Sequence, residues 1–226
     1  KTASAIWAAD YLMTQGKVNR VLVICPLSIM DSAWRNDLFA FAMHRSVDVA
    51  HGSKDKRKKI INSGADFVII NYDGVEVVKD EIANGGFDLF ITHYKNAQTK
   101  RWKTLNKLIG DNDWLWMMTG TPAAQSPVDA YGLAKLVNPL SVPRFFGSWR
   151  DMVMWKVTQF TWKPKDTSKD TVFQVLQPAI RFTKDECLDL PDMVYHAGGR
   201  RRCYSRQCRD QFKQAPTDKC RCGVHR

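Results

Sequence analysis

The chain has 226 residues, enough for one large domain or for one domain with an appendage. Its apolar fraction of 44% and charged fraction of 25% are typical of a globular protein. No apolar run approaches the roughly 18 residues of a membrane-spanning helix, so we expect no membrane partner. The formal net charge of +11 suits a polyanionic partner but does not demand one.

Apolar, strand-like runs alternate with helix-like segments along most of the chain. The pattern predicts helices over 3–15, 31–43, 54–63, 75–83, 99–109 and 126–137, and strands over 21–25, 47–51, 67–71, 88–91 and 114–118. We expect Gly16 to end the first helix, Asp31 to cap the second, and Ser126 with Pro127 to begin the last. Such alternation implies right-handed crossovers, and therefore an α/β fold whose parallel sheet is covered by helices on both faces.

The last third of the chain has a different character. Residues 140–178 are rich in aromatic side chains and favour helices packed on the domain, and 179–195 predict a last strand and turn. Residues 198–226 carry nine Lys or Arg against two Asp and have almost no aliphatic side chains. Such a segment cannot build a core. We therefore expect a main domain over 1–195 and a basic tail over 196–226 that is disordered or translated from a shifted reading frame.

The six cysteines favour a reducing compartment. Cys25 lies in a predicted buried strand, and the main domain offers no disulfide framework, which indicates an intracellular protein of the cytoplasm or nucleus. The tail holds Cys203, Cys208, Cys220 and Cys222, whose spacing is not usual for zinc. A frame shift explains this Arg- and Cys-rich composition better than a zinc site does.

Four predicted strands each end in a polar turn. The four segments are VLVICPLSIMDSAW (21–34), DFVIINYDGV (66–75), FDLFITHYKN (87–96) and WLWMMTGTPAAQSP (114–127). Because the carboxyl ends of parallel strands meet at one edge of a sheet, we expect these turns to form one ligand-binding edge. Lys1 and Thr2 open the chain before the first helix.

In this order the motifs resemble those of the first RecA-like lobe of a superfamily 2 helicase, and most closely the Swi/Snf-like double-stranded DNA translocases. The resemblance covers about residues 1–195, and it ends on AIRFTKDECLDLPDM (179–193). It implies a RecA-like P-loop NTPase lobe that uses ATP and magnesium. Because the chain opens in the middle of a motif, we also expect its N-terminus to be incomplete.

The resemblance assigns roles to individual residues. Lys1 and Thr2 would end a Walker A loop, in which the Lys pairs with the ATP phosphates and the Thr hydroxyl binds magnesium. The Thr119–Pro122 turn, with Gly120 and Thr121 at its centre, would couple the nucleotide site to the DNA groove, and it is therefore expected close to Lys1 and Thr2. The residues that match DNA-contacting positions are Pro26, Leu27, Ser28, Asn71, Tyr72, Lys95 and Asn96.

One expected motif is absent. The family places an Asp-Glu-x-His motif after the fourth strand, where the Asp holds magnesium and the Glu polarises the attacking water. Here about four residues, including both acids, are missing between Ile91 and Thr92, so no catalytic acid is intact. Asp88 precedes the strand and cannot replace them, and His93 aligns ambiguously with the last residue of the motif.

Three functions remain as alternatives. The first is an ATP-dependent motor lobe on double-stranded DNA, inactive alone because the second RecA-like lobe supplies the arginine fingers. The second is a non-enzymatic, basic nucleic-acid-binding remnant. A small P-loop kinase is disfavoured because it explains neither the Thr119–Pro122 turn nor Lys95-Asn96. The run KDKRKK (54–59) could contact phosphates, although a solvated helix face explains it better.

Overall fold

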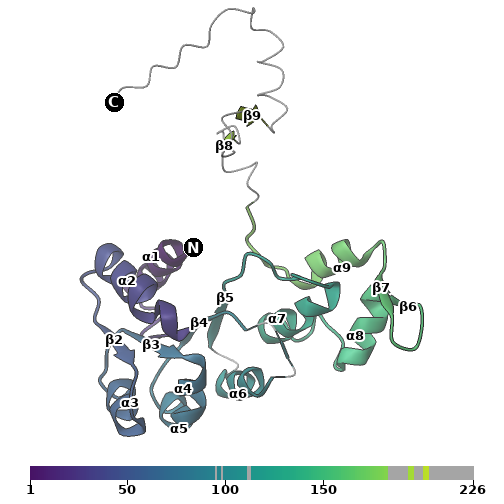
Figure 1. Cartoon of the computed structure of the whole chain (residues 1–226). Helices are drawn as coiled ribbons and strands as arrows, with labels where there is room; N and C mark the ends of the chain where they lie inside the picture. Colours follow the sequence, from purple (N-terminus) through teal and green to yellow (C-terminus); the bar gives the residue numbers. More distant parts are fainter. Residues whose placement is uncertain (95, 98, 111–112, 183–192, 196–200, 204–226) are drawn as a thin grey trace, which may run out of the picture. The chain divides into compact units, whose positions relative to one another are not determined.

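The computed structural model describes residues 1–94, 96–97, 99–110, 113–182, 193–195 and 201–203 (Figure 1). The chain divides into two compact units, Lys1–Pro178 and Ala179–Arg226. Within the described residues, no helix is long and apolar enough to cross a membrane. The boundary expected near residue 195 stays a prediction.

A five-stranded parallel sheet is the centre of the first unit, as predicted. Its strands are β1 (Val21–Cys25), β2 (Val47–Ala50), β3 (Phe67–Asn71), β4 (Leu89–Thr92) and β5 (Trp114–Met117), in the order β2-β3-β1-β4-β5. All five residues of the central strand β1 are buried. Strands buried on both faces read as continuous apolar runs, which is why VLVIC and FVIIN carry so clear a signal.

Alternate residues of each strand enter two separate cores, because successive side chains of a strand point to opposite faces. On one face, Val21 and Val23 pack with α1 (Thr2–Thr14), the π-helical segment η2 (Met30–Arg35) and α2 (Asn36–Phe41). On the other, Leu22 and Ile24 pack with α3 (Lys54–Ile61), α4 (Tyr72–Val77), α5 (Lys79–Ala83) and α6 (Lys100–Leu108). Figure 1 shows these two layers on either side of the sheet.

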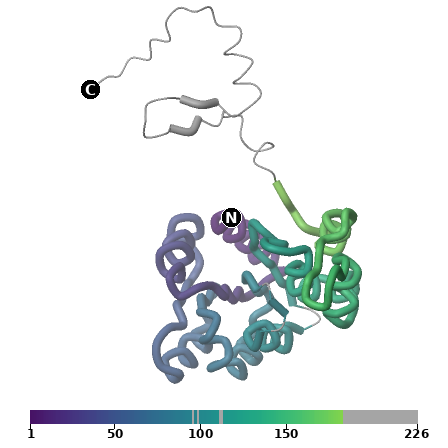
Figure 2. The backbone as a smooth tube through the Cα atoms, turned by 45° about the vertical axis from the view of Figure 1, so that its right-hand side comes forward, coloured from purple at the N-terminus to yellow at the C-terminus, as the bar shows by residue number. Residues whose placement is uncertain are grey.

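A third core follows β5 and contains the aromatic segment. It joins α7 (Ala130–Val137), α8 (Phe146–Val153) and α9 (Ser168–Val175) around the fully buried Trp149. The helices expected here are present, but the structure adds a hairpin that the sequence analysis did not predict. Its strands are β6 (Met154–Lys156) and β7 (Trp162–Pro164), which pair antiparallel. The backbone runs continuously from the sheet into this helical group (Figure 2).

Several helix boundaries differ from the predicted ones. Asp31 does not cap a helix: it lies inside the first turn of η2, which Ile29 precedes, and η2 and α2 replace one helix over 31–43. The helix expected over 75–83 begins at Tyr72 and breaks at Val78, whose side chain is fully buried. The burial of Val78 against the sheet is a tertiary constraint that the helical pattern does not contain.

Other terminal signals act as expected. Gly16 follows α1 with φ of +67°, a conformation that glycine adopts without strain. The 3₁₀ turn η3 (Pro127–Asp129) leads into α7. The backbone N–H of Ser126, the residue that precedes η3, donates to the Asp129 carboxylate at 3.1 Å. Ser126 and Pro127 thus begin this helical segment, as predicted.

The second unit contains a short antiparallel pair, β8 (Met193–Tyr195) with β9 (Arg201–Cys203). The last strand predicted over 179–195 is present at 193–195, while 179–182 form no strand and 183–192 lie outside the described residues. Arg201–Cys203 form a strand inside the tail, and the expectation that the tail is disordered or frame-shifted stays a prediction. The remaining tail, including Cys208, Cys220 and Cys222, is outside the described residues.

Candidate functional site

The turns after the strands meet at the carboxyl edge of the sheet, as the parallel order requires. Cys25 at the end of β1 is in register with Asn71 at the end of β3, and Thr92 of β4 is in register with Met117 of β5. The segments that follow these four residues therefore begin at one edge. This arrangement is the one that the sequence pattern predicted.

Lys1 reaches this edge and contacts the turn after β5. Its Nζ lies 2.8 Å from the point that a Cβ atom on Gly120 would occupy. A Cβ atom at 120 would therefore require the end of the flexible Lys1 side chain to shift. Lys1 and Gly120 are far apart in sequence, and their contact is the arrangement expected for the predicted nucleotide site.

The start of α1 adds to the cationic character of this place. Lys1 precedes the helix without a side-chain cap, and the first turn, which opens with the half-buried Thr2, holds no acidic residue. The first backbone N–H groups of a helix have no intrahelical partner, and they carry the positive end of the helix dipole. Together with the Lys1 amine they form a site suited to phosphate groups.

Hydrogen bonds order the turn after β5 and join it to β4. The Thr121 N–H donates to Thr119 Oγ1 at 3.1 Å, and the Met118 N–H donates to the Thr92 carbonyl at 2.9 Å. His93 Nδ1 lies 2.5 Å from the Met118 carbonyl, so this nitrogen carries a proton and donates it. The ring of His93 therefore joins the two turns, a structural role that sequence alignment did not identify.

Asp88 lies at the opposite end of β4 from this edge. Its carboxylate accepts hydrogen bonds from the Asn19 N–H at 2.8 Å, the Asn19 side chain at 2.9 Å and the Arg20 N–H at 3.0 Å. A strand rises about 3.3 Å per residue, so the four residues of β4 separate Asp88 from Thr92 by more than 10 Å. The structure therefore places Asp88 away from this edge, as its position before the strand predicted.

The described residues offer fewer candidate ligands for magnesium than for phosphate. Among the described residues, no group of three or more His, Cys, Asp or Glu side chains is arranged to hold a metal ion. The Thr2 hydroxyl remains the one ligand that the sequence analysis proposed. The start of α1 thus fits the phosphates of a nucleotide, and Thr2 would offer a hydroxyl to the magnesium ion that accompanies them.

The chain around the missing motif contains two buried hydroxyl groups without a partner. Within the described part of the chain, neither Thr92 Oγ1 nor Tyr94 Oη makes a hydrogen bond, although both are shielded from water. Each such group costs about 1–3 kcal/mol. Burial raises the pKa of Tyr94, and it raises the pKa of Tyr72, whose ring centroid lies 4.9 Å away, to about 12. The described hydroxyl groups of Thr92 and Tyr94 thus lack hydrogen-bond partners in the segment where the acidic motif is expected.

The predicted DNA-contacting residues that the structure describes lie at the same edge, but they are not equally accessible. Pro26 precedes the exposed 3₁₀ turn η1 (Leu27–Ile29), in which Leu27 and Ser28 face solvent. Asn96 is exposed, and Lys95 lies outside the described residues.

Asn71 is held by a basic residue of the KDKRKK run. Arg57 Nη1 donates to Asn71 Oδ1 at 2.7 Å and to the Ala50 carbonyl at 2.9 Å. A Cβ atom on Gly74 would lie 2.1 Å from the same nitrogen, so glycine makes room for this inward guanidinium. Lys58 of the run pairs with Glu81. Arg57 and Lys58 therefore serve the fold, which favours the helix-face interpretation over a phosphate patch.

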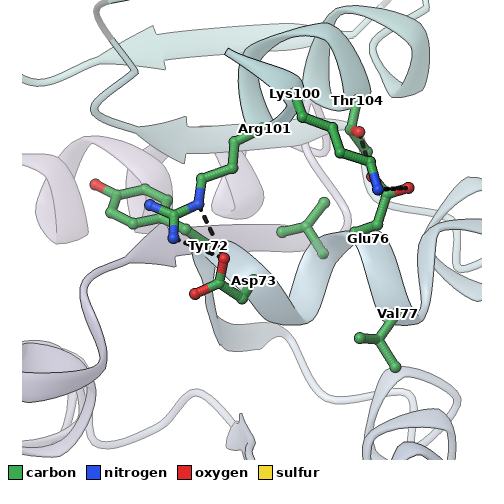
Figure 3. A pocket seen from close by; sticks show the side chains of 8 residues that line it. Tyr72, Asp73, Glu76, Val77, Lys100, Arg101 and Thr104 are labelled. Carbon is green, nitrogen blue, oxygen red and sulfur yellow. Dashed lines mark hydrogen bonds and ion pairs between the residues drawn. The ribbon is translucent and has the colours of Figure 1, made fainter.

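Tyr72 lines a cavity of about 220 Å³ between α4 and α6 (Figure 3). Arg101 pairs with Asp73 at 2.7 Å, and its guanidinium lies 6.0 Å from the centre of the Tyr72 ring. Lys100 pairs with Glu76 at 3.4 Å. The hydrogen bond from Thr104 and the Lys100 pair lower the pKa of Glu76. These charges pair with one another and link the two helices, a relationship that sequence reasoning missed because the partners come from separate motifs.

Comparisons with known proteins agree with this geometry. Residues 1–197 match the family model of the SNF2-related domain. The fold is similar to that of the Sulfolobus solfataricus SWI2/SNF2 ATPase core in complex with dsDNA, with a TM-score of 0.67 and 22% identity over 84% of this chain and 40% of that chain. The Sulfolobus solfataricus SWI2/SNF2 ATPase core domain gives 0.60 and 20% over 83% and 38%. This chain thus spans about two fifths of either structure. No curated protein matches its sequence at a significant level.

Proposed function

This chain belongs to the SNF2-related domain family, and we propose on that basis that residues 1–195 are the ATP-binding lobe of a Swi/Snf-like DNA translocase. The observation that carries the proposal is the contact between Lys1 and Gly120. It joins the end of a Walker A-like segment to the turn after β5, which is the pair of motifs that a RecA-like lobe needs at one edge.

In this proposal the start of α1 binds ATP. The uncapped N–H groups of the helix and the Lys1 amine bind the phosphates, and Thr2 offers its hydroxyl to the accompanying magnesium. Bound ATP supplies the transferable phosphoryl group, and magnesium neutralises its charge. Gly120 allows the Thr119–Pro122 turn to lie against the Lys1 amine, so that the turn can respond to the presence of phosphate.

We further propose that these 226 residues do not hydrolyse ATP by themselves. Phosphoryl transfer needs a metal-binding acid, a group that orients water and an arginine finger. Asp88 is engaged by Asn19 and Arg20 at the far end of its strand, and no acid cluster occurs among the described residues. The second RecA-like lobe of the family would be the source of the fingers.

The proposed partner is the phosphate backbone of double-stranded DNA. Exposed Ser28 of η1 and Asn96 lie at the same edge as the nucleotide site, and the net charge of +11 attracts a polyanion. One similar structure is described as a complex with dsDNA, which supports the choice of duplex. The buried free thiol of Cys25 supports an intracellular location.

Equilibrium binding of a fluorescent ATP analogue to the full chain tests this function. Lys1→Ala should weaken binding by about tenfold or more, since it removes the cation beside the phosphates. Lys17→Ala is the matched control, because Lys17 is exposed and follows the opposite end of α1. Equal affinities for both variants and the unmodified chain would instead favour the alternative, a basic remnant that binds nucleic acid without a nucleotide.

A further inference from the structure

The hairpin formed by β6 and β7 combines lysines with exposed aromatic rings, and no role has been assigned to it. Residues 152–165 include Lys156, Lys163 and Lys165 but no Asp or Glu. The hairpin lies beside α8, in the part of the first unit that follows β5 (Figure 1). It is thus separate in sequence from every motif turn at the carboxyl edge.

The rings of the hairpin are exposed although the hairpin itself is firmly anchored. Trp155 is 62% exposed, and Phe160, in the connecting turn, is 88% exposed. Val153 and Met154 at its base are buried in the third core, and the Lys165 N–H donates to the Val153 carbonyl at 3.0 Å. The hairpin is therefore an anchored element that holds two large apolar rings in water.

The turn that carries Phe160 is ordered by its own hydrogen bonds. The Val157 N–H donates to the Thr161 carbonyl at 2.9 Å, and the Thr161 N–H donates to Thr158 Oγ1 at 3.0 Å. The ring of Phe160 is therefore presented on a closed turn rather than on an unstructured loop. Pre-organisation of this kind lowers the entropy that a ligand must overcome on binding.

Strand pairing places charge next to the rings. Trp155 is directly opposite Lys163, and such cross-strand neighbours share one face of a hairpin. Lys165 Nζ lies 4.5 Å from the centre of the Trp155 ring, and this amine also donates to the Asp151 carbonyl at 2.5 Å. More than half of the Trp155 side chain nevertheless stays open to solvent. A planar ligand that carries negative charge would therefore contact the Trp155 ring and a neighbouring lysine amine at the same time.

We propose that the β6–β7 hairpin binds unpaired bases of single-stranded DNA, which stack on Trp155 and Phe160 while Lys163, on the same face as Trp155, neutralises an adjacent phosphate. Aromatic platforms with interspersed cations are the chemistry by which proteins hold single strands without sequence preference. Bases inside a duplex stack on one another and offer no free face. An acidic peptide would satisfy the lysines, but it would leave the rings without planar partners.

This second contact does not rest on the proposed ATPase function. The hairpin shares no residue with the nucleotide site or with the turns expected to contact duplex phosphates. If both proposals hold, the lobe binds a duplex at the edge of its sheet and an unpaired strand at the hairpin. A failure to bind ATP would leave the hairpin proposal intact, so the two can be separated.

Binding of a fluorescent oligo-dT to the full chain, measured by anisotropy, tests the proposal. Phe160→Ala and Trp155→Ala should each weaken binding about fivefold or more, which is the loss expected for one stacked base. Phe39→Ala is the matched control, since Phe39 is an exposed ring on α2. Lys163→Gln should lower the slope of log affinity against log salt by about 0.7. The arginine-rich tail is present in every variant and contributes equally.

An abasic oligomer of the same length separates stacking from attraction between charges. The aromatic variants should bind it as the unmodified chain does, and an equal loss on both oligomers would overturn the proposal. Irradiation with an iodouracil oligomer gives a second measurement, which should crosslink the tryptic peptide 157–165, because trypsin does not cleave the bond between Lys163 and Pro164. Crosslinks found only elsewhere, or competition by poly-glutamate that matches competition by oligo-dT, would also overturn it; the latter outcome would point to an acidic protein partner.

Discussion

The side-chain amine of Lys1 lies 2.8 Å from the position that a Cβ atom on Gly120 would occupy. Two residues that are far apart in the sequence therefore lie in contact. The contact depends on the absence of a side chain at 120. It links whatever binds at the start of α1 to the turn that follows β5. A substitution at Gly120 should therefore affect ligand binding before it affects folding.

Gly120→Val should lower the affinity for an ATP analogue by about tenfold, because the new side chain occupies the place of the Lys1 amine. Titration of a fluorescent analogue measures the loss, and urea unfolding checks that stability changes by less than about 1 kcal/mol. Gly147→Ala is the control, since a Cβ atom at 147 would meet nothing within 4 Å. Unchanged affinity of the Gly120 variant would mean that the turn after β5 does not contribute to the phosphate site.

Asp88→Ala should destabilise the fold and leave nucleotide binding unchanged. Its half-buried carboxylate accepts hydrogen bonds from Asn19 and Arg20 at the amino end of β4, and their loss should cost about 1–3 kcal/mol in urea unfolding. Asp166→Ala, at an exposed position, should have little effect. A fall in ATP affinity without loss of stability would instead return Asp88 to the nucleotide site.

In the proposed function this lobe has no intact acidic motif and takes its arginine fingers from a second lobe, and the fingers alone are worth about 10³–10⁵ in rate. The purified chain should therefore show no DNA-stimulated ATP hydrolysis. A coupled assay for released phosphate measures this. Insertion of Val-Asp-Glu-Ala after Ile91, together with the Walker A glycines and the second lobe, should restore activity. Turnover by the present chain that Lys1→Ala abolishes would mean that the acidic motif lies elsewhere.

Asp10 should make stability depend on pH in the acid range. Burial raises its pKa, but hydrogen bonds from Arg45 at 2.7 Å and His44 at 2.8 Å outweigh this effect and leave the pKa below its usual value. A carboxylate with a lowered pKa stabilises the fold above its unfolded pKa of about 3.9, and that contribution is lost as the pH falls through the folded pKa. Asp10→Asn should therefore be less stable than the unmodified chain at pH 7. Urea unfolding should show the difference shrinking below about pH 4.

Duplex DNA binding should be weak, salt-sensitive and independent of sequence. Contacts to phosphates position a protein without specifying bases, and each adds roughly 0.9 to the slope of log affinity against log salt. A salt series on several duplexes should compare residues 1–197 with the full chain, because the tail adds charge-driven binding. A tenfold preference for one duplex, with affinity unchanged by truncation, would indicate a sequence-reading domain instead.

Much of this molecule follows from local pattern. The runs 21–25 and 67–71 are strands because parallel strands buried on both faces must be apolar throughout. Gly16 ends α1, because a φ above zero favours glycine. Ser126 begins η3, and the Asp129 carboxylate caps its backbone N–H. The order of strand ends then predicts one edge for the motif turns, and the place of Asp88 before its strand already excludes it from that edge.

Tertiary structure decided what pattern could not. Arg57 lies in a run of charges that reads as a solvated face, yet it turns inward to Asn71 because Gly74 leaves space on a neighbouring helix. Val78 breaks a helix because burial outweighs helical continuity, and Trp155 pairs with Lys163 in a hairpin stabilised by its attachment to the third core. Each outcome depends on atoms distant in sequence. Propensity and spacing therefore determine which elements form, and packing determines which side chains meet.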